Sequence, residues 1–161
     1  MTFSFDERGN LKTLQPIEAS WEDVEHFFVQ RMANSDTRRQ LWTNFAEFTL
    51  RFREEVAQAF TIWLDGSFVT RKVDPRDIDA VFLIDYRVCE RSKSVLENRW
   101  FIAENKLKKG LDLYYSIEYP ENHKRHFLTH LNRLYWLDIY GHTRKDITGR
   151  QQIKGFIQIT I

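Results

Sequence analysis

The sequence has little cysteine, glycine or proline and no long apolar run. Its 161 residues include one cysteine, six glycines and three prolines. The single cysteine, Cys89, excludes an internal disulfide bond and a zinc site built on several thiolates. No apolar run approaches the ~20 residues that a membrane-spanning helix needs, and the polar first residues do not form a secretion signal. We therefore expect a cytoplasmic protein without a membrane partner.

An excess of either charge is also absent. The 24 basic and 23 acidic residues give a net charge of +1, which by itself demands neither a nucleic-acid nor a membrane partner. Aromatic residues are abundant instead, with 13 Phe, 6 Tyr and 5 Trp, and they indicate a folded interior. The length suits one domain, 1–161, with a helical part (1–59), a sheet carrying the motifs (60–118) and a final helix and strand (119–161).

Apolar periodicity predicts the secondary structure. Four helices are expected at Ser20–Ala33, Thr37–Ala59, Arg91–Lys109 and His123–Tyr135, with Gly110 ending the third. The aromatic stripe of the second helix is typical of a buried face. Strands are expected at Met1–Phe5, Phe60–Leu64, Asp77–Ile84, Leu111–Glu118 and Lys154–Ile161. The pattern predicts an α+β (or α/β) fold, with long N-terminal helices against a small mixed sheet.

Two aspartates that share a strand face are the strongest indication of chemistry. Asp77 and Asp79 flank one isoleucine, so both carboxylates project to the same side. Like charges at this separation repel, and a cation between them relieves the repulsion. Upstream, Gly66 and Ser67 form a turn whose free backbone N–H groups suit a phosphate.

A third carboxylate completes a metal site of the kind that phosphoryl chemistry uses. Asp112 lies between Leu111 and Leu113, so burial of these leucines directs Asp112 to the opposite face of its strand. We expect Asp77, Asp79 and Asp112 to surround Mg²⁺ at the sheet surface.

The order of these motifs resembles the nucleotidyltransferase superfamily of DNA polymerase beta. A Gly66-Ser67 turn is followed by Asp77-Ile78-Asp79 on one strand and by Asp112 on a later strand. The sequence motif D-G-S-F-V-T-R-K-x-x-P-x-D-I-D is similar to one in a group of small uncharacterised bacterial proteins of nucleotidyltransferase type. The segments Phe5–Leu11 and Lys154–Ile157 also resemble the ends of that group.

The resemblance implies a fold, a reaction and roles for these residues. The fold is the polymerase beta-like sheet, and the reaction moves a nucleoside monophosphate from an NTP, with ATP as the expected donor, to a hydroxyl of a protein, tRNA or small molecule. Asp77 and Asp79 hold two Mg²⁺ ions, and Asp112 holds the catalytic ion and helps to activate the hydroxyl. Gly66 and Ser67 bind the β- and γ-phosphates, and the basic residues of the following loop, Arg71 and Lys72, contact phosphate.

Other functions stay open at this point. Ser67 and Asp77 are one residue closer than in the common minimal pattern, and Asp65 places a negative charge before the glycine. These departures suit a catalytically inactive nucleotidyltransferase-like module, such as an antitoxin or a phage-defence partner. A basic cluster over His123–Arg133 also suits an RNA-binding protein. His126 and His130 share a helical face there, but no third metal ligand accompanies them.

Overall fold

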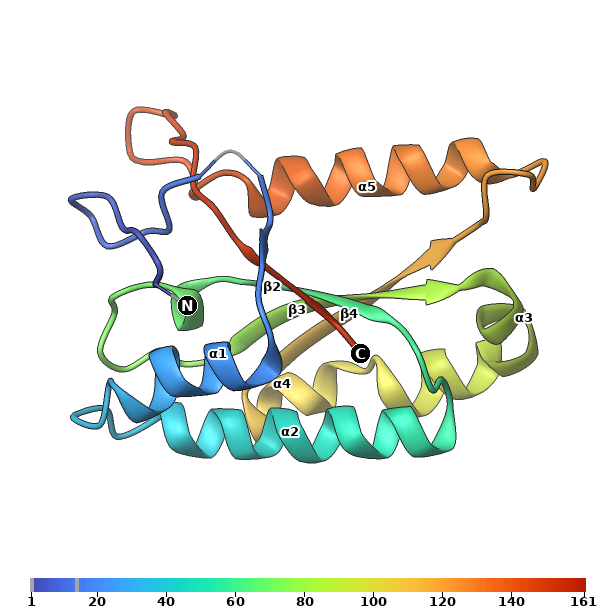
Figure 1. The fold of residues 1–161 in the computed structure, drawn as a ribbon, viewed down its shortest axis with the longest axis horizontal. Coiled ribbons are helices and arrows are strands. Elements are labelled where there is room, and N and C mark those ends of the chain that lie inside the picture. The colour runs from blue at the N-terminus through green and yellow to red at the C-terminus, as the bar shows by residue number, and fades with distance from the viewer. Residues whose placement is uncertain (1, 14) are drawn as a thin grey trace.

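A five-stranded mixed sheet forms the centre of the computed structural model, which describes residues 2–13 and 15–161 (Figure 1). Its strands are β1 (Ile17–Glu18), β2 (Thr61–Asp65), β3 (Ile78–Asp85), β4 (Leu111–Glu118) and β5 (Ile157–Thr160). They lie in the order β1-β5-β2-β3-β4, and β4 forms one edge of the sheet. β3 is parallel to β4 and antiparallel to β2, which confirms the predicted mixed sheet and α+β class.

Helices cover both faces of the sheet (Figure 1). They are α1 (Trp21–Glu25), α2 (Arg38–Glu55), α3 (Tyr86–Val95), α4 (Ala103–Lys109) and α5 (His126–Tyr140). A π-helical turn extends α1 (His26–Gln30) and another extends α3 (Leu96–Trp100), while a 3₁₀ turn, Ser67–Val69, follows β2. Each described helix is too short or too polar to cross a membrane.

The alternation of side chains along β3 divides the core into two unequal parts. Ile78, Ala80, Phe82 and Ile84 are buried on the face that packs against α1, α2 and α3. The intervening residues Val81 and Leu83 face α5, where a smaller cluster joins them to Trp63, Tyr140 and Phe156. The aspartates at the start of β3 share this second face, so the candidate site lies on the α5 side of the sheet.

The aromatic stripe of α2 is core, as its periodicity predicts. Phe45, Phe48 and Phe52 are buried, and their rings lie 6.3, 5.7 and 5.3 Å from the ring of Phe82 in edge-on arrangements. Such pairs contribute about 0.5–1.5 kcal/mol each beyond the burial of their area. This packing anchors β3, the strand that carries the paired aspartates, to the longest helix.

Several predicted boundaries are wrong, and each for a physical reason. The expected strand at residues 1–5 is only an isolated bridge from Phe5 to Leu11, and Met1 lies outside the described residues. The third helix begins at Tyr86 rather than Arg91, because the Asp85 carboxylate caps it by accepting the N–H of Arg87. That helix is also interrupted at residues 101–102, where the backbone leaves the helical region.

The last helix runs further than local periodicity predicts. The sequence pattern ends it at Tyr135, yet α5 extends to Tyr140. Tyr140 is buried against Phe156, with ring centroids 5.8 Å apart. Because this partner lies 16 residues along the chain, just before β5, only the tertiary fold reveals the extra turn.

Candidate metal centre

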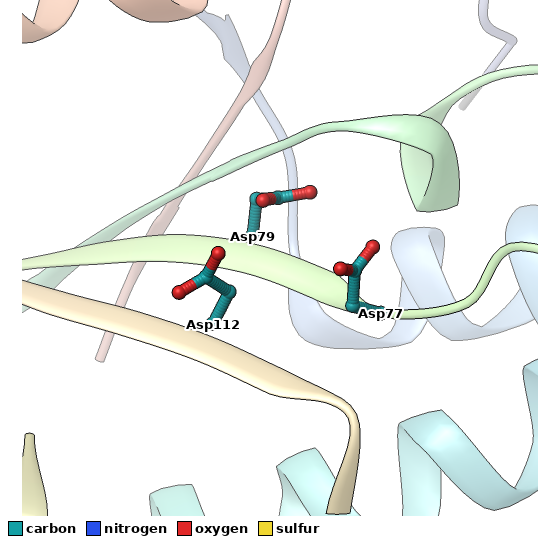
Figure 2. A group of neighbouring side chains, drawn as sticks. All are labelled: Asp77, Asp79 and Asp112. Carbon is teal, nitrogen blue, oxygen red and sulfur yellow. The ribbon is translucent and has the colours of Figure 1, made fainter. Parts of the chain in front are cut away.

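Three carboxylates meet at the start of β3 and β4. Asp79 and Asp112 are direct partners in the parallel pairing, and Asp77 immediately precedes β3 on the same face. One carboxylate oxygen from each of the three residues lies within 4.8 Å of the others. Figure 2 shows the three side chains projecting to the same side of the sheet. The structure therefore brings together all three predicted ligands.

A fourth aspartate extends this group into a row across three strands. Asp65, the last residue of β2, pairs directly with Asp79 in the antiparallel register. Its side chain is only 10% exposed and forms an ion pair with the equally buried Lys154. The sequence shows Asp65 as a charge beside the glycine turn, but its partner lies 89 residues away and is visible only in the fold.

Burial and the neighbouring carboxylates shift the pKa of Asp79, which lies at the centre of the row. Burial, together with the negative charges of Asp77, Asp65 and Asp112, raises the pKa of Asp79 to about 6, and Lys106 opposes the rise. Burial also raises the pKa of Asp65 above its ordinary value, and the charge of Lys154 offsets only part of this rise. A divalent cation would remove this repulsion, so the site is electrostatically prepared for one.

One lysine bridges two of the candidate metal ligands. The ammonium of Lys106 on α4 contacts the Asp112 carboxylate and lies 3.7 Å from an oxygen of Asp77. In the sequence Lys106 resembles its neighbours Lys108 and Lys109, because all three read as the charged side of a helix. The side chain of Lys106 is 46% exposed, so it is free to leave for solvent or for an anionic ligand.

The glycine turn lies against the central aspartate. Gly66 has φ +75° and ψ −165°, a conformation that is essentially restricted to glycine. A Cβ atom at this position would lie 1.8 Å from Oδ2 of Asp79. Ser67 then begins the 3₁₀ turn. The predicted turn therefore lies against the Asp79 carboxylate, the central member of the candidate metal ligands.

A buried arginine holds the loop that follows this turn. The guanidinium of Arg38 donates hydrogen bonds to five backbone carbonyls, those of Phe28, Phe68, Thr70, Lys72 and Val73. Arg38 is 1% exposed, and burial lowers its pKa to about 10. Sequence reasoning missed this residue, because neighbouring Arg39 offers the same local signal and is exposed.

The turn and the carboxylates line a cleft of about 680 Å³. Its basic residues are Lys72, Arg76, Lys106, Arg144 and Lys154. The predicted residues Gly66, Ser67, Lys72, Asp77 and Asp79 all line this cleft. Arg71 does not, because its guanidinium lies 5.0 Å above the ring of Phe5. Asp112 faces a neighbouring groove that it shares with Lys106 and Tyr114.

The residues present fit a hard divalent cation. Carboxylate oxygens are the ligands that Mg²⁺, Mn²⁺ and Ca²⁺ prefer. Tyr140 lines the same cleft, and among the described residues its buried hydroxyl has no hydrogen-bond partner. An orphaned polar atom beside clustered charges is typical of a site whose ligand is a further component. In the described part of the chain, this is the one group of three or more potential ligands.

The two histidines on α5 take no part in this site. The Nδ1 atom of His126 is 2.7 Å from the Tyr119 carbonyl oxygen, and its ring packs edge-on against His130. Within the described residues, these two histidines join no group of three potential ligands.

Comparison with known proteins supplies a family. A sequence model described as a family of unknown function, DUF6932, matches residues 3–160. No curated protein and no solved structure matches the chain.

Proposed function

The chain belongs to the DUF6932 family, whose function is unknown, and we propose that it is a Mg²⁺-dependent nucleotidyltransferase. It moves a nucleoside monophosphate from an NTP, with ATP as the expected donor, to an acceptor hydroxyl. One observation carries this proposal: three carboxylates lie within 4.8 Å of one another, and two of them, Asp77 and Asp79, line a cleft with basic walls that the glycine turn also lines. Residues that can bind a cation and residues that can bind phosphate thus lie close together.

Three of the four aspartates are the proposed metal ligands. Asp77 and Asp79 would hold two Mg²⁺ ions, and Asp112 would help to hold the catalytic one. When bound, the ions neutralise the phosphates and the charge that develops during transfer. Asp65 is not assigned as a ligand, because Lys154 already neutralises it.

The cleft walls bind the triphosphate. The backbone of the Gly66-Ser67 turn lines the cleft and would contact the β- and γ-phosphates. Lys72 and Arg76 line the same cleft and add charge-assisted hydrogen bonds. Arg38 acts indirectly, by fixing the backbone carbonyls of the loop that carries Lys72. Arg71 has no phosphate role here, since it packs on Phe5.

Positioning and charge neutralisation drive the reaction. The acceptor oxygen forms a bond to the α-phosphorus, the bond from that phosphorus to the bridging oxygen breaks, and pyrophosphate leaves. Asp112 accepts the hydroxyl proton, because it faces a groove that opens beside the phosphate cleft. Preorganised charges of this kind supply most of the rate in phosphoryl-group chemistry.

The resemblance to the polymerase beta superfamily supports the same assignment, because its motifs fall on residues that line or border one cleft. The proposal places the reaction in the cytoplasm, where NTP and Mg²⁺ are available. The acceptor is a hydroxyl of a protein, such as a toxin or defence partner, or of a tRNA.

Labelled nucleotide tests the proposal. The protein is incubated with Mg²⁺, an NTP labelled at the α-phosphate, and total cellular RNA or protein. Label is expected in one acceptor class with wild-type protein but not with Asp77→Asn/Asp79→Asn. Glu47→Gln, an exposed charge outside the cleft, is the matched control and is expected to label normally. Equal labelling by the double variant and the wild type would exclude this active site.

A non-catalytic binding module is the second candidate, and one observation favours it. Lys106 already supplies a cation to Asp77 and Asp112, as in a site that needs no metal. This candidate predicts nucleotide or partner binding that is unchanged by EDTA. The enzyme candidate predicts that EDTA abolishes nucleotide binding.

A further inference from the structure

An exposed apolar stripe runs along α5 on the side away from the sheet. Phe127, Leu131, Leu134 and Tyr135 are 58, 57, 62 and 61% exposed. Thr129 and Tyr140 of the same helix are buried and face the protein. In the described part of the structure no element covers the outer side of α5, as Figure 1 shows. A contiguous group of this kind on one helix marks an interaction surface.

The spacing of the stripe suits helix-to-helix pairing. Phe127, Leu131 and Leu134 are separated by four and then three residues, which is the repeat of a coiled-coil seam. Lys124 lies in the turn just before α5, three residues before Phe127, and Asp138 lies within the helix, four residues after Leu134. The Asp138 side chain is 81% exposed, and Lys124 is also exposed. The seam therefore has a positive end, an apolar middle and a negative end.

This charge order is self-complementary in one orientation. When two copies of α5 pair antiparallel, the positive end of each seam meets the negative end of the other, and the apolar residues meet in the middle. Parallel pairing would place like charges together at both ends. We propose that the chain forms a two-fold symmetric dimer through α5, with Leu131 near the axis and Lys124 of each copy facing Asp138 of its partner copy.

A second copy fits this surface better than RNA does. The residues of the stripe are apolar or aromatic, and its C-terminal end is acidic, so a phosphate backbone would gain little there. The dimer is independent of the proposed enzyme activity, because the metal ligands lie on the sheet beneath α5 and the stripe faces outward.

Sedimentation of the full chain over a range of concentrations tests the dimer. Wild-type protein is expected to sediment as a dimer, and Leu131→Glu as a monomer at every concentration. Leu50→Glu is the matched control, since Leu50 lies on α2 and is also 57% exposed. It is expected to leave the dimer intact, and circular dichroism checks that both variants are folded.

Charge exchange tests the orientation. Lys124→Glu alone, or Asp138→Lys alone, is expected to raise the dimer dissociation constant roughly tenfold, because two attractive pairs become repulsive. Mixing the two single variants is expected to restore wild-type affinity in a heterodimer. A monomeric wild-type chain overturns the proposal, whether or not that chain binds RNA in a salt-sensitive way. Failure of the mixture to recover affinity overturns the antiparallel arrangement.

Discussion

Gly66 leaves space that the Asp79 carboxylate occupies: a Cβ atom at residue 66 would lie 1.8 Å from Oδ2 of Asp79. The two residues lie 13 positions apart in the sequence, and the β2–β3 pairing places them together. The glycine is therefore required by the side chain of a candidate metal ligand as well as by its own positive φ.

Gly66→Ala is expected to abolish metal binding, because its Cβ displaces Asp79. Gly149→Ala is the matched control, since Gly149 has a similar φ of +79° and its Cβ would meet no described atom within 4 Å. Both variants carry a backbone penalty of about 1–3 kcal/mol, because both glycines have a positive φ. Mn²⁺ titration of the two purified variants measures the difference. Metal affinity that falls equally in both would contradict the proposed contact.

Arg38→Met is expected to lower the free energy of unfolding by about 3–5 kcal/mol, because five backbone carbonyls, all buried or partly buried, lose a charged donor. Arg39→Met, at the exposed neighbour, is expected to change it by less than about 0.5 kcal/mol. Urea unfolding measures both. Arg38→Lys is not expected to restore stability, since an ammonium has only three donors. Similar stability of the Arg38→Met and Arg39→Met variants would show that the loop holds without the guanidinium.

Asp79→Asn is expected to stabilise the metal-free protein at neutral pH. The pKa of Asp79 is raised to about 6 in the folded state, so folding opposes its ionisation. The protonated side chain of Asp79 therefore contributes fully to the stability of the folded protein below the ordinary pKa of ~3.9. This contribution is lost as the pH rises through about 6. The loss amounts to about 3 kcal/mol at 1.36 kcal/mol per pKa unit.

Unfolding of wild type and Asp79→Asn between pH 4 and pH 8 checks this relation. The advantage of the variant is expected to be small at the acid end and to reach its maximum above about pH 6. Saturating Mg²⁺ is expected to remove the advantage, because the ion stabilises only the carboxylate form. A constant difference across the pH range would mean that Asp79 titrates normally.

Lys106→Met is expected to tighten Mn²⁺ binding about 3- to 10-fold in the absence of nucleotide, because the ammonium competes for Asp77 and Asp112. The same variant is expected to bind ATP more weakly, since the ammonium lines the phosphate cleft. Lys108→Met is the control, because Lys108 pairs with exposed Glu104 on its own helix, away from the carboxylates. Weaker Mn²⁺ binding by the Lys106 variant would assign that lysine a supporting role instead.

Local patterns were sufficient to predict the strands that carry the site. Leu111–Glu118 alternates cleanly and follows a glycine with φ +67°, so its start, its end and the direction of Asp112 could all be read from the sequence. The two-residue period of a strand was enough to predict that Asp77 and Asp79 project to the same face. Their convergence with Asp112 followed once β3 and β4 were neighbours.

Contacts between distant residues could not be read in the same way. Lys154 meets Asp65 across 89 residues, and Arg38 meets loop carbonyls 30 or more residues away. Arg38 and Lys106 each stand beside residues of the same type that lie exposed, so no local signal separates them. The early start of α3 depended on Asp85 acting as a helix cap, although the alternation placed it at a strand end.

Mn²⁺ binding with and without ATP tests whether Asp77, Asp79 and Asp112 form a nucleotide-dependent metal site. Electron paramagnetic resonance of free Mn²⁺ reports the number of bound ions without requiring knowledge of the acceptor. We expect that wild-type protein binds Mn²⁺, that ATP increases the binding, and that Asp77→Asn/Asp79→Asn abolishes both effects. Binding that ATP does not increase, or that the double variant retains, would contradict a nucleotidyl-transfer site at these carboxylates.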